Sequence, residues 1–295
     1  MSNPCVQCPR RCGLDRTHTN GFCNVPFSFY IARAALHHWE EPSISGTAGS
    51  GTIFFSGCNL RCVFCQNKDV SRGNLGKAVT EDELADIMLR LQEDGAHNIN
   101  LVTPSHYAKQ LSALLTRIKP MLRIPIVYNS GGYDLVDTLK HLEGLVDIYL
   151  PDIKYYSPEL SARYSAASDY FTVAMDALAE MLRQTGTPQF DQNGLLQRGT
   201  IVRHLILPAQ RHDSILLLRA LRERFGSNVF LLSLMSQYTP CFAADTSFPE
   251  LHRRITSFEY ESVLRIVEEL GFDGYFQERS SASSDFTPDF NEITF

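Results

Sequence analysis

The chain lacks the features that would place it in a membrane, in a secretion pathway or on nucleic acid. No apolar run in its 295 residues approaches the roughly 20 residues that span a bilayer. The N-terminus has no basic segment followed by an apolar one, the pattern of a secretory signal peptide. A net charge of −6 and scattered Lys and Arg residues give no extended basic stripe for nucleic-acid phosphates. We therefore expect a cytoplasmic protein whose partners include neither membrane nor nucleic acid.

Cysteine is the residue type whose distribution is informative. Hydrophobic residues make up 44% and charged residues 20% of the chain, which is ordinary globular usage. Cys241 stands alone, whereas the other cysteines fall into two tight groups. The groups are Cys5, Cys8, Cys12 and Cys23, and Cys58, Cys62 and Cys65. In a reducing compartment such grouping indicates metal binding rather than a disulfide framework.

From residue 50 onward, short apolar runs alternate with segments of helical period. Parallel strands that helices cover on both faces are continuously apolar, and six runs have this character. They are residues 52–56, 98–103, 126–129, 146–150, 200–207 and 229–233. The alternation predicts an α/β fold, a partial barrel of six βα units similar to an incomplete TIM barrel.

Helix boundaries and domain limits can also be predicted from the sequence. Thr80 with Glu83, and Thr256 with Glu259, form capping boxes ahead of helical apolar patterns. The polar, Gly- and Pro-marked stretch 187–199 predicts a loop or short hairpin. Residues 1–30 have no sustained periodicity and predict a small cysteine-rich, metal-organised extension. We assign residues 31–279 to the barrel and residues 280–295 to a C-terminal tail.

The group Cys58, Cys62 and Cys65 directly follows the first predicted strand. A cubane iron–sulfur cluster takes one thiolate per iron, so three cysteines hold three irons and leave one coordination site open. A zinc knuckle is the alternative, but structural zinc sites close with four ligands. The loop also lies at the C-terminal end of a strand, where barrel enzymes place their chemistry.

This spacing, with Phe64 directly before the last cysteine, resembles the defining motif of the radical S-adenosylmethionine (SAM) superfamily. The flanking residues 51–57 and 66–67 are similar to the pyruvate formate-lyase activating enzyme group, and more narrowly to its activating enzyme-like branch. Further stretches that resemble this branch are residues 100–107, 126–133, 147–155, 202–208 and 233–240. The resemblance extends over essentially the whole chain.

The resemblance implies an oxidoreductase of anaerobic chemistry with a [4Fe-4S] cluster and SAM as cofactors. The open iron would chelate SAM, and reductive cleavage would release a 5′-deoxyadenosyl radical that abstracts hydrogen. A flavodoxin- or ferredoxin-like protein would supply the electron. The implied partner is a glycyl radical enzyme or another protein substrate. A different peptide or a small molecule is the alternative substrate.

Asp152 and Lys154 match the Asp-x-Lys strand end of the activating enzymes, which implies a grip on SAM. Their i, i+2 spacing puts both side chains on one face of a strand, and an exposed ion pair is the alternative. Asn129 and Ser130 stand where those enzymes carry an aspartate–threonine pair beside SAM. For these two residues a turn before Gly131 is the alternative.

The remaining candidates for cofactor binding are Phe64, Arg203, His204 and Tyr238. Phe64 belongs to the cysteine motif. Strand alternation points one of Arg203 and His204 into the cavity and the other away from it. Tyr238 stands near the position where activating enzymes place a histidine against adenine, and burial in the core is the alternative. Residues 103–105 lack the glutamate with which relatives hold the SAM amino group.

Cys5, Cys8, Cys12 and Cys23 supply four soft ligands. Four thiolates close a metal site completely, as in structural zinc or a fully ligated iron–sulfur cluster. Zinc would fasten the N-terminus, and an auxiliary cluster could relay electrons. Unmetallated thiols are the third reading of the same residues.

Overall fold

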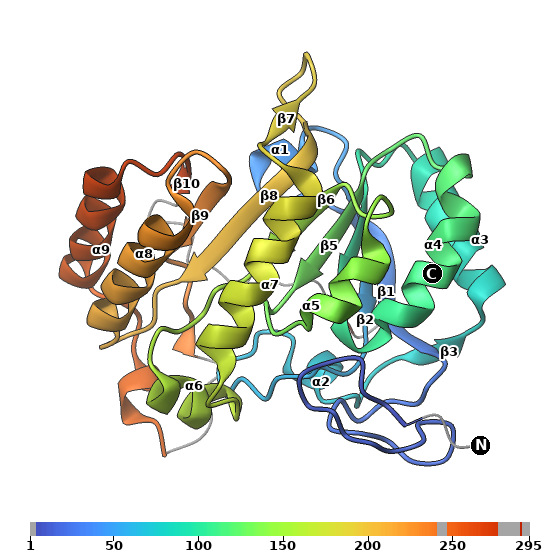
Figure 1. Cartoon of the computed structure of the whole chain (residues 1–295), viewed down its shortest axis with the longest axis horizontal. Helices are drawn as coiled ribbons and strands as arrows, with labels where there is room; N and C mark the ends of the chain where they lie inside the picture. The colour runs from blue at the N-terminus through green and yellow to red at the C-terminus, as the bar shows by residue number, and fades with distance from the viewer. Residues whose placement is uncertain (1–3, 241–246, 277–289, 291–295) are drawn as a thin grey trace.

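The strands form one curved sheet that is mostly parallel (Figure 1). The computed structural model describes residues 4–240, 247–276 and 290. Within these residues nine strands follow the order β10-β9-β8-β6-β5-β4-β2-β1-β3, and a tenth, β7, pairs with β8 beside this path. They are β1 (Phe29–His37), β2 (Ser50–Phe55), β3 (Lys77–Val79), β4 (Ile99–Val102), β5 (Ile126–Ser130), β6 (Ile148–Pro151), β7 (Gln189–Phe190), β8 (Leu196–Leu205), β9 (Leu231–Met235) and β10 (Gly274–Phe276).

All six predicted parallel strands are confirmed. In the series β2, β4, β5, β6, β8 and β9, each strand pairs in parallel with the next member of the series. Every residue of β2, β5 and β6 is buried, which explains why these runs carry no polar alternation. Because the strands are parallel, their C-terminal ends meet at one edge of the sheet.

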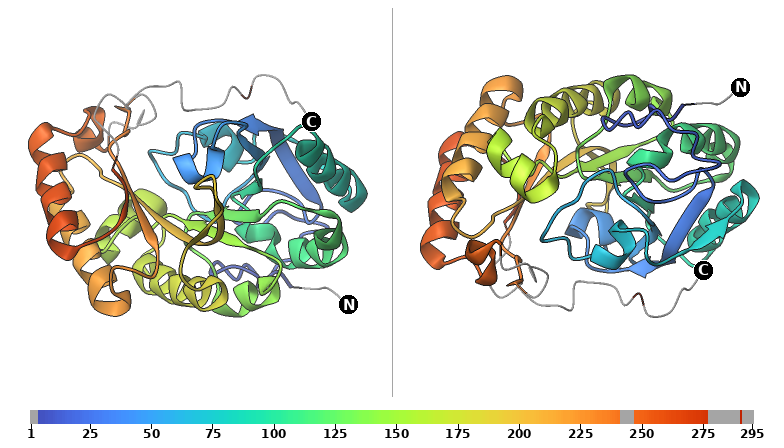
Figure 2. Two further views of the ribbon diagram at one scale, coloured as in Figure 1. Left: turned by 90° about the horizontal axis from the view of Figure 1, so that it is seen from above. Right: turned by 90° about the horizontal axis from the view of Figure 1, so that it is seen from below.

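The barrel is partial and does not close. β1 and β3 form an antiparallel edge beside β2, and β10 is the last strand at the other edge. Within the described residues no ladder joins β3 to β10. Seen along the strands in Figure 2, the sheet curves into an open ring with the helices on its outer side. The prediction did not include β1, β3 or β10, the strands that form these two edges.

The helices are α1 (Pro42–Ser45), α2 (Lys68–Ser71), α3 (Glu81–Glu93), α4 (Ala108–Ile118), α5 (Val136–Leu139), α6 (Pro158–Ser165), α7 (Tyr170–Thr185), α8 (Arg211–Phe225) and α9 (Ser257–Leu270). The longer ones cover the convex face of the sheet (Figures 1 and 2). The short helices α1 and α2 instead contribute residues to its inner side. Short 3-10 turns occupy Ser105–Tyr107, Lys119–Met121, Lys140–Leu142 and Pro249–His252. Both predicted capping boxes are confirmed, at the starts of α3 and α9. The predicted hairpin is also present, because β7 pairs antiparallel with the start of β8.

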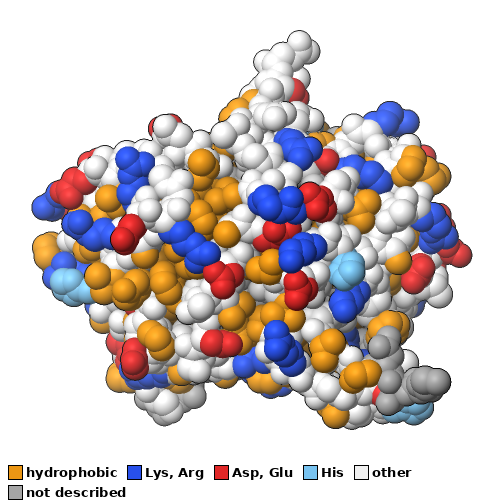
Figure 3. Space-filling model, in the orientation of Figure 1, with side chains coloured by type: hydrophobic (Ala, Val, Ile, Leu, Met, Phe, Trp, Pro, Cys, Tyr) orange, Lys and Arg blue, Asp and Glu red, His pale blue; other side chains and the backbone are white. Residues whose placement is uncertain are grey.

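Residues 4–28 contain no helix or strand and lie beside α2, below the sheet in Figure 1. Cys241 and the predicted tail, apart from Phe290, lie outside the described residues. No described helix is both long and apolar enough to cross a membrane. On the face shown in Figure 3, Lys and Arg side chains are interspersed with Asp and Glu side chains.

The start of α9 depends on the buried carboxylate of Glu259. Its oxygens accept hydrogen bonds from Thr256 N at 2.7 Å and Ala209 N at 2.7 Å, and Arg253 Nη2 pairs with it at 2.8 Å. The Arg253 contact, helped by these backbone bonds, lowers the pKa of Glu259 to about 2. The ionised form therefore stabilises the fold.

We predict that Glu259→Gln removes a stabilisation that depends on pH. The lowered pKa means that the contribution is fully present above the unfolded-state value near 4.5 and is lost as pH falls toward 2. At pH 7 the variant should lose about 2 kcal/mol of unfolding free energy, and its loss should shrink below pH 4. Urea unfolding at several pH values measures this. The exposed Glu261→Gln on the same helix is the control, and an equal pH dependence in both variants would contradict the assignment.

Candidate functional site

A cavity of about 330 Å³ opens at the C-terminal ends of the parallel strands. Cys58, Cys62 and Cys65 all line it, from the loop that follows β2. Residues of β5, β8 and β9, together with Asp152 and Lys154 directly after β6, also line it. The cysteine motif and the predicted strand ends therefore face the same enclosed space.

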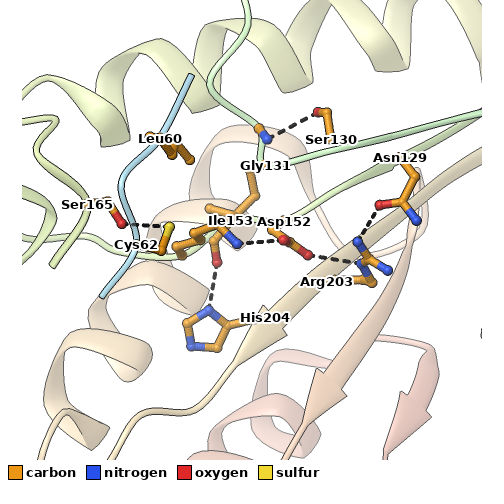
Figure 4. A network of polar contacts seen from close by, with 12 residues as sticks. Leu60, Cys62, Asn129, Ser130, Gly131, Asp152, Ile153, Ser165, Arg203 and His204 are labelled. Atoms are coloured by element: carbon orange, nitrogen blue, oxygen red, sulfur yellow. Dashed lines mark hydrogen bonds and ion pairs between the residues drawn. The ribbon is translucent and has the colours of Figure 1, made fainter. Parts of the chain in front are cut away.

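Backbone and side-chain contacts fix the cysteine loop. Gly57 N donates to Val70 O at 2.8 Å, and its positive φ of +80° begins the turn. Leu60 N donates to Cys58 Sγ at 3.3 Å. Ser165 Oγ, at the end of α6, donates to Cys62 Sγ at 3.0 Å (Figure 4). Hydrogen bonds of this kind hold thiolate ligands in place and stabilise their negative charge.

Burial keeps the free thiols of Cys58 and Cys65 protonated at neutral pH, so binding of a metal would have to displace their protons. Burial raises the pKa values of Cys58 and Cys65, and the Lys154 ammonium opposes the rise in both. No three His, Cys, Asp or Glu side chains among the described residues converge on a point that a single metal ion could occupy. A cubane cluster instead puts each cysteine on a different iron. Three cavity-facing thiols on one short loop supply the donor set that such a cluster needs.

Asp152 and Lys154 line the same cavity as this loop and belong to a largely buried network. Lys154 Nζ lies 2.5 Å from Asp152 Oδ2, and their side chains are 18% and 20% exposed. Arg203 Nε pairs with Asp152 Oδ1 at 2.9 Å. The alternative of an exposed strand-end ion pair is therefore wrong, because both partners are mostly buried and line the cavity.

All three members of this network are charged at neutral pH. Burial raises the pKa of Asp152, but Arg203 and Lys154 outweigh it and bring the pKa below its usual value. Burial lowers the pKa of Lys154, but Asp152 and Cys62 outweigh it and raise the pKa. Lys154 is thus held as an ammonium beside the cysteine loop.

Asn129 and Ser130 line the cavity at the end of β5, but both side chains already have protein partners. Arg203 Nη2 donates to Asn129 Oδ1 at 2.5 Å (Figure 4). Ser130 Oγ donates to Asp134 Oδ2 at 2.7 Å and accepts from Gly132 N at 3.1 Å. These residues shape the turn after β5 and also form part of the wall.

Arg203 faces the cavity and His204 faces away. The sequence predicted that only one of these neighbours in β8 points inward, and the structure shows that it is Arg203. His204 is buried and its Nδ1 donates to Ile153 O at 2.7 Å. Tyr238 also stands outside the cavity wall, and its hydroxyl donates to Leu251 O at 2.6 Å. Phe64 lines the cavity, with Tyr238 behind it at a ring distance of 6.3 Å. The structure thus brings six of the eight predicted cofactor-binding residues to the cavity and leaves out His204 and Tyr238.

Sequence reasoning missed Ser165, Glu40 and Glu41. Ser165 lies 103 residues from Cys62, so no local pattern links them. Glu40 and Glu41 line the cavity from the segment after β1, a strand that the sequence pattern did not predict. Their detection depended on placing that strand.

The N-terminal segment packs against the cysteine loop. The Arg10 guanidinium lies 3.8 Å from the Phe22 ring centre and donates to Asn59 O at 2.8 Å. Arg61 Nη2 donates to Phe22 O at 2.9 Å. Gln7 Nε2 donates to His106 O at 2.8 Å. Residues from both cysteine groups therefore share one packed region.

The four N-terminal thiols lie close enough to influence one another electrostatically. Burial, helped by the other three cysteines, raises the pKa of Cys8 to about 12. Burial also raises the pKa of Cys23, which Arg16 opposes. None of the four lines the cavity that holds the other cysteine group.

Comparisons with known proteins identify the family of the chain. Residues 52–190 match the family model of the Radical SAM superfamily. The uncharacterized protein MJ0674 of Methanocaldococcus jannaschii is 31% identical over 278 residues, covering 91% of this chain and 75% of that protein. On this sequence evidence, the chain belongs to the radical SAM superfamily. Membership implies a [4Fe-4S] cluster and SAM as cofactors.

One of two similar solved structures has a TM-score above 0.5 and shares the fold. The FeFe-hydrogenase maturase HydG from Carboxydothermus hydrogenoformans has a TM-score of 0.51 at 14% identity, over 80% of this chain and 59% of that chain. Methylornithine synthase PylB gives 0.48 at 18% identity, over 72% of this chain and 59% of that chain. The chain thus spans about three fifths of either structure's length. The matched family model covers the whole superfamily and does not separate its branches.

We predict that Gly57→Ala prevents normal loading of the cysteine loop. A Cβ at Gly57 would stand 2.5 Å from Cys23 O, in a backbone conformation of positive φ. Gly95→Ala is the matched control, because Gly95 has a φ of +89° and nothing within 4 Å of an added Cβ. Both variants should lose about 1 kcal/mol from backbone strain, but only Gly57→Ala should also lose bound iron. Iron counted per chain after anaerobic reconstitution measures this, and full loading of Gly57→Ala would refute it.

Proposed function

We propose that this protein binds a [4Fe-4S] cluster on Cys58, Cys62 and Cys65 and cleaves SAM reductively. The observation that carries the proposal is that these cysteines and the Asp152–Lys154 pair line one cavity. When bound, the cluster and SAM supply a 5′-deoxyadenosyl radical that abstracts hydrogen. The chain's residues hold these groups, keep water out and position the substrate.

Lys154 is the residue that we assign to the methionine carboxylate of SAM. Its ammonium acts on the thiols of Cys58 and Cys65, so it lies near the loop where SAM would bind. Lys154 can turn to a ligand because Arg203 remains paired with Asp152 at 2.9 Å. Asp152 therefore stays neutralised when Lys154 contacts SAM, which avoids the cost of a buried unpaired charge.

We further propose a glycyl radical enzyme as the recipient of the radical, with the electron supplied by a flavodoxin- or ferredoxin-like protein. The support is the resemblance of residues 51–57 and 66–67 to the activating enzymes, and of residues 126–133 and 147–155 to their activating enzyme-like branch. A different peptide or a small molecule is the second candidate. It is favoured by the two carboxyl groups of Glu40 and Glu41 on the cavity wall.

The cluster-loaded protein should form 5′-deoxyadenosine when mixed anaerobically with SAM and a strong reductant. Chromatography of the products measures the 5′-deoxyadenosine formed, and its absence would reject the proposed enzyme activity. Addition of a glycyl radical enzyme should then give a glycine-centred paramagnetic signal. Steady 5′-deoxyadenosine formation without that signal would reject the glycyl radical recipient and retain the radical SAM activity.

Two lysine variants give the matched control for this experiment. Lys154→Met should weaken SAM binding roughly tenfold or more, because one charge-assisted contact is lost while the side-chain volume is kept. Lys140→Met should leave SAM binding unchanged, since Lys140 is 55% exposed and pairs with Asp137. Equal SAM affinity in both variants would reject the assignment of Lys154 to the methionine carboxylate.

We also propose that Cys5, Cys8, Cys12 and Cys23 hold one metal centre, either a second cluster, in which each thiolate binds a different iron, or zinc. Zinc would have to draw the thiols together, because no three of them now converge on a single point. Their mutual electrostatic influence and the packing of Arg10 beside the cysteine loop support it. The double variant Cys5→Ser/Cys8→Ser should lose about one zinc or about four irons per chain, while the iron on the other group is retained. Elemental analysis of both proteins decides the metal. Identical zinc and iron contents would exclude a metal at this position.

A further inference from the structure

Glu40, Glu41, Arg203 and Ser233 form the deep end of the cavity. Asn100, Arg203 and Ser233 each lie two residues before the end of their strand, in β4, β8 and β9. The cysteine loop begins beyond the end of β2, so strand geometry puts these residues about 7 Å deeper along the sheet. Asn100 Nδ2 donates to Glu40 Oε1 at 2.9 Å, which fixes Glu40 at that depth.

The carboxyl groups that line the cavity outnumber its cations. Within the described residues, the carboxyls are Glu40, Glu41 and Asp152, and the side chains charged at neutral pH that oppose them are Lys154 and Arg203. His37 also lines the cavity, but burial lowers its pKa to about 4, so it is neutral at pH 7.

Glu41 is the cavity carboxyl group that has no cation as a partner in the described part of the chain. Asp152 pairs with both cations, and Arg203 Nη1 reaches Glu40 Oε2 at 3.3 Å. No ion pair within 4.0 Å is formed by Glu41 among the described residues. One cavity-lining carboxyl thus has no cation in contact.

Glu41 is also the least satisfied carboxyl in the cavity wall. The residue is 9% exposed, and its Oε2 atom is buried without a hydrogen-bond partner. Burial raises its pKa, while Arg203 and a hydrogen bond from Ser233 oppose the rise. Glu41 stands at the N-cap position of α1, yet its side chain caps nothing there. A buried acceptor without a donor is costly, so a helix-capping role does not explain this glutamate.

We infer that the deep end of the cavity, at Glu40 and Glu41, binds a cationic nitrogen group of the substrate, an alkylammonium or a guanidinium. This inference rests on the proposed function, because it names the substrate class of the same cavity. Such a group donates several hydrogen bonds and would supply both the missing charge and the missing donor at Glu41 Oε2. Trp39, which directly precedes Glu40, also lines the cavity, and aromatic rings attract cations.

Trp39 also provides a direct reading of occupancy. It is the chain's single tryptophan and it lines the cavity next to Glu40 and Glu41. Its fluorescence in the cluster-loaded full chain, with SAM present and reductant omitted, should therefore respond to a ligand bound beside Glu40 and Glu41. No catalytic turnover is needed for the measurement.

The experiment is a titration with n-butylamine, with n-butanol and butyrate as neutral and anionic controls of similar size. We expect a saturable change in Trp39 fluorescence with n-butylamine alone, and equilibrium dialysis should give about one bound amine per chain. Glu41→Gln should weaken this binding roughly tenfold or more. Glu93→Gln, an exposed glutamate on α3, should bind like the parent protein.

Three results would overturn the inference. These are no saturable binding of n-butylamine to the parent protein, equal binding of n-butanol, or unchanged affinity in Glu41→Gln. The first two need no variant, so a folding defect cannot obscure them. Amine binding without 5′-deoxyadenosine formation would instead reject the proposed function while retaining the site. A second titration uses a blocked Gly-Lys-Gly peptide. Tighter binding of the peptide than of n-butylamine would indicate a lysine side chain of a protein substrate, and tighter binding of n-butylamine would indicate a free amine.

Discussion

The carboxylate of Asp152 is the charge on which the cavity depends. It holds the Lys154 ammonium at 2.5 Å and the Arg203 guanidinium at 2.9 Å, and Arg203 continues to Asn129 and Glu40. Through these contacts one acidic group joins β5, β6, β8 and the segment after β1. Two buried cations of this kind would repel each other without the carboxylate between them. The network therefore sets both the shape of the wall and the charge that a ligand meets.

The parallel strands and the cysteine loop could be predicted because their signals are local. β2, β5 and β6 are buried throughout, and that burial appears in the sequence as uninterrupted apolar runs. The three-cysteine spacing lies within eight residues of one loop, and its chemistry follows from the ligand count. The capping boxes of α3 and α9 are also local and were predicted for the same reason.

The remaining features depend on contacts between distant parts of the chain. Alternation indicated that one of Arg203 and His204 faces inward, but the choice is made by Asp152, 51 residues earlier. Tyr238 could stack on a ligand by its type, yet its hydroxyl is bonded to Leu251 O and its ring lies behind Phe64. β1 was missed because its mixed pattern of buried and half-buried residues borders the cysteine-rich segment. Glu40 and Glu41, which follow β1, were therefore also not predicted as cavity residues.

The contacts of Arg10 and Ser165 set an order in which the site can be completed during synthesis. Arg10 bonds to Ser165 O and Ala166 O, which lie 155 and 156 residues further along the chain. The hydrogen bond from Ser165 to Cys62 likewise waits for the end of α6. When the cysteine loop first leaves the ribosome, these partners do not yet exist. Until more than half of the chain has been made, Cys62 therefore lacks its hydrogen bond from Ser165, and Arg10 lacks both carbonyl partners.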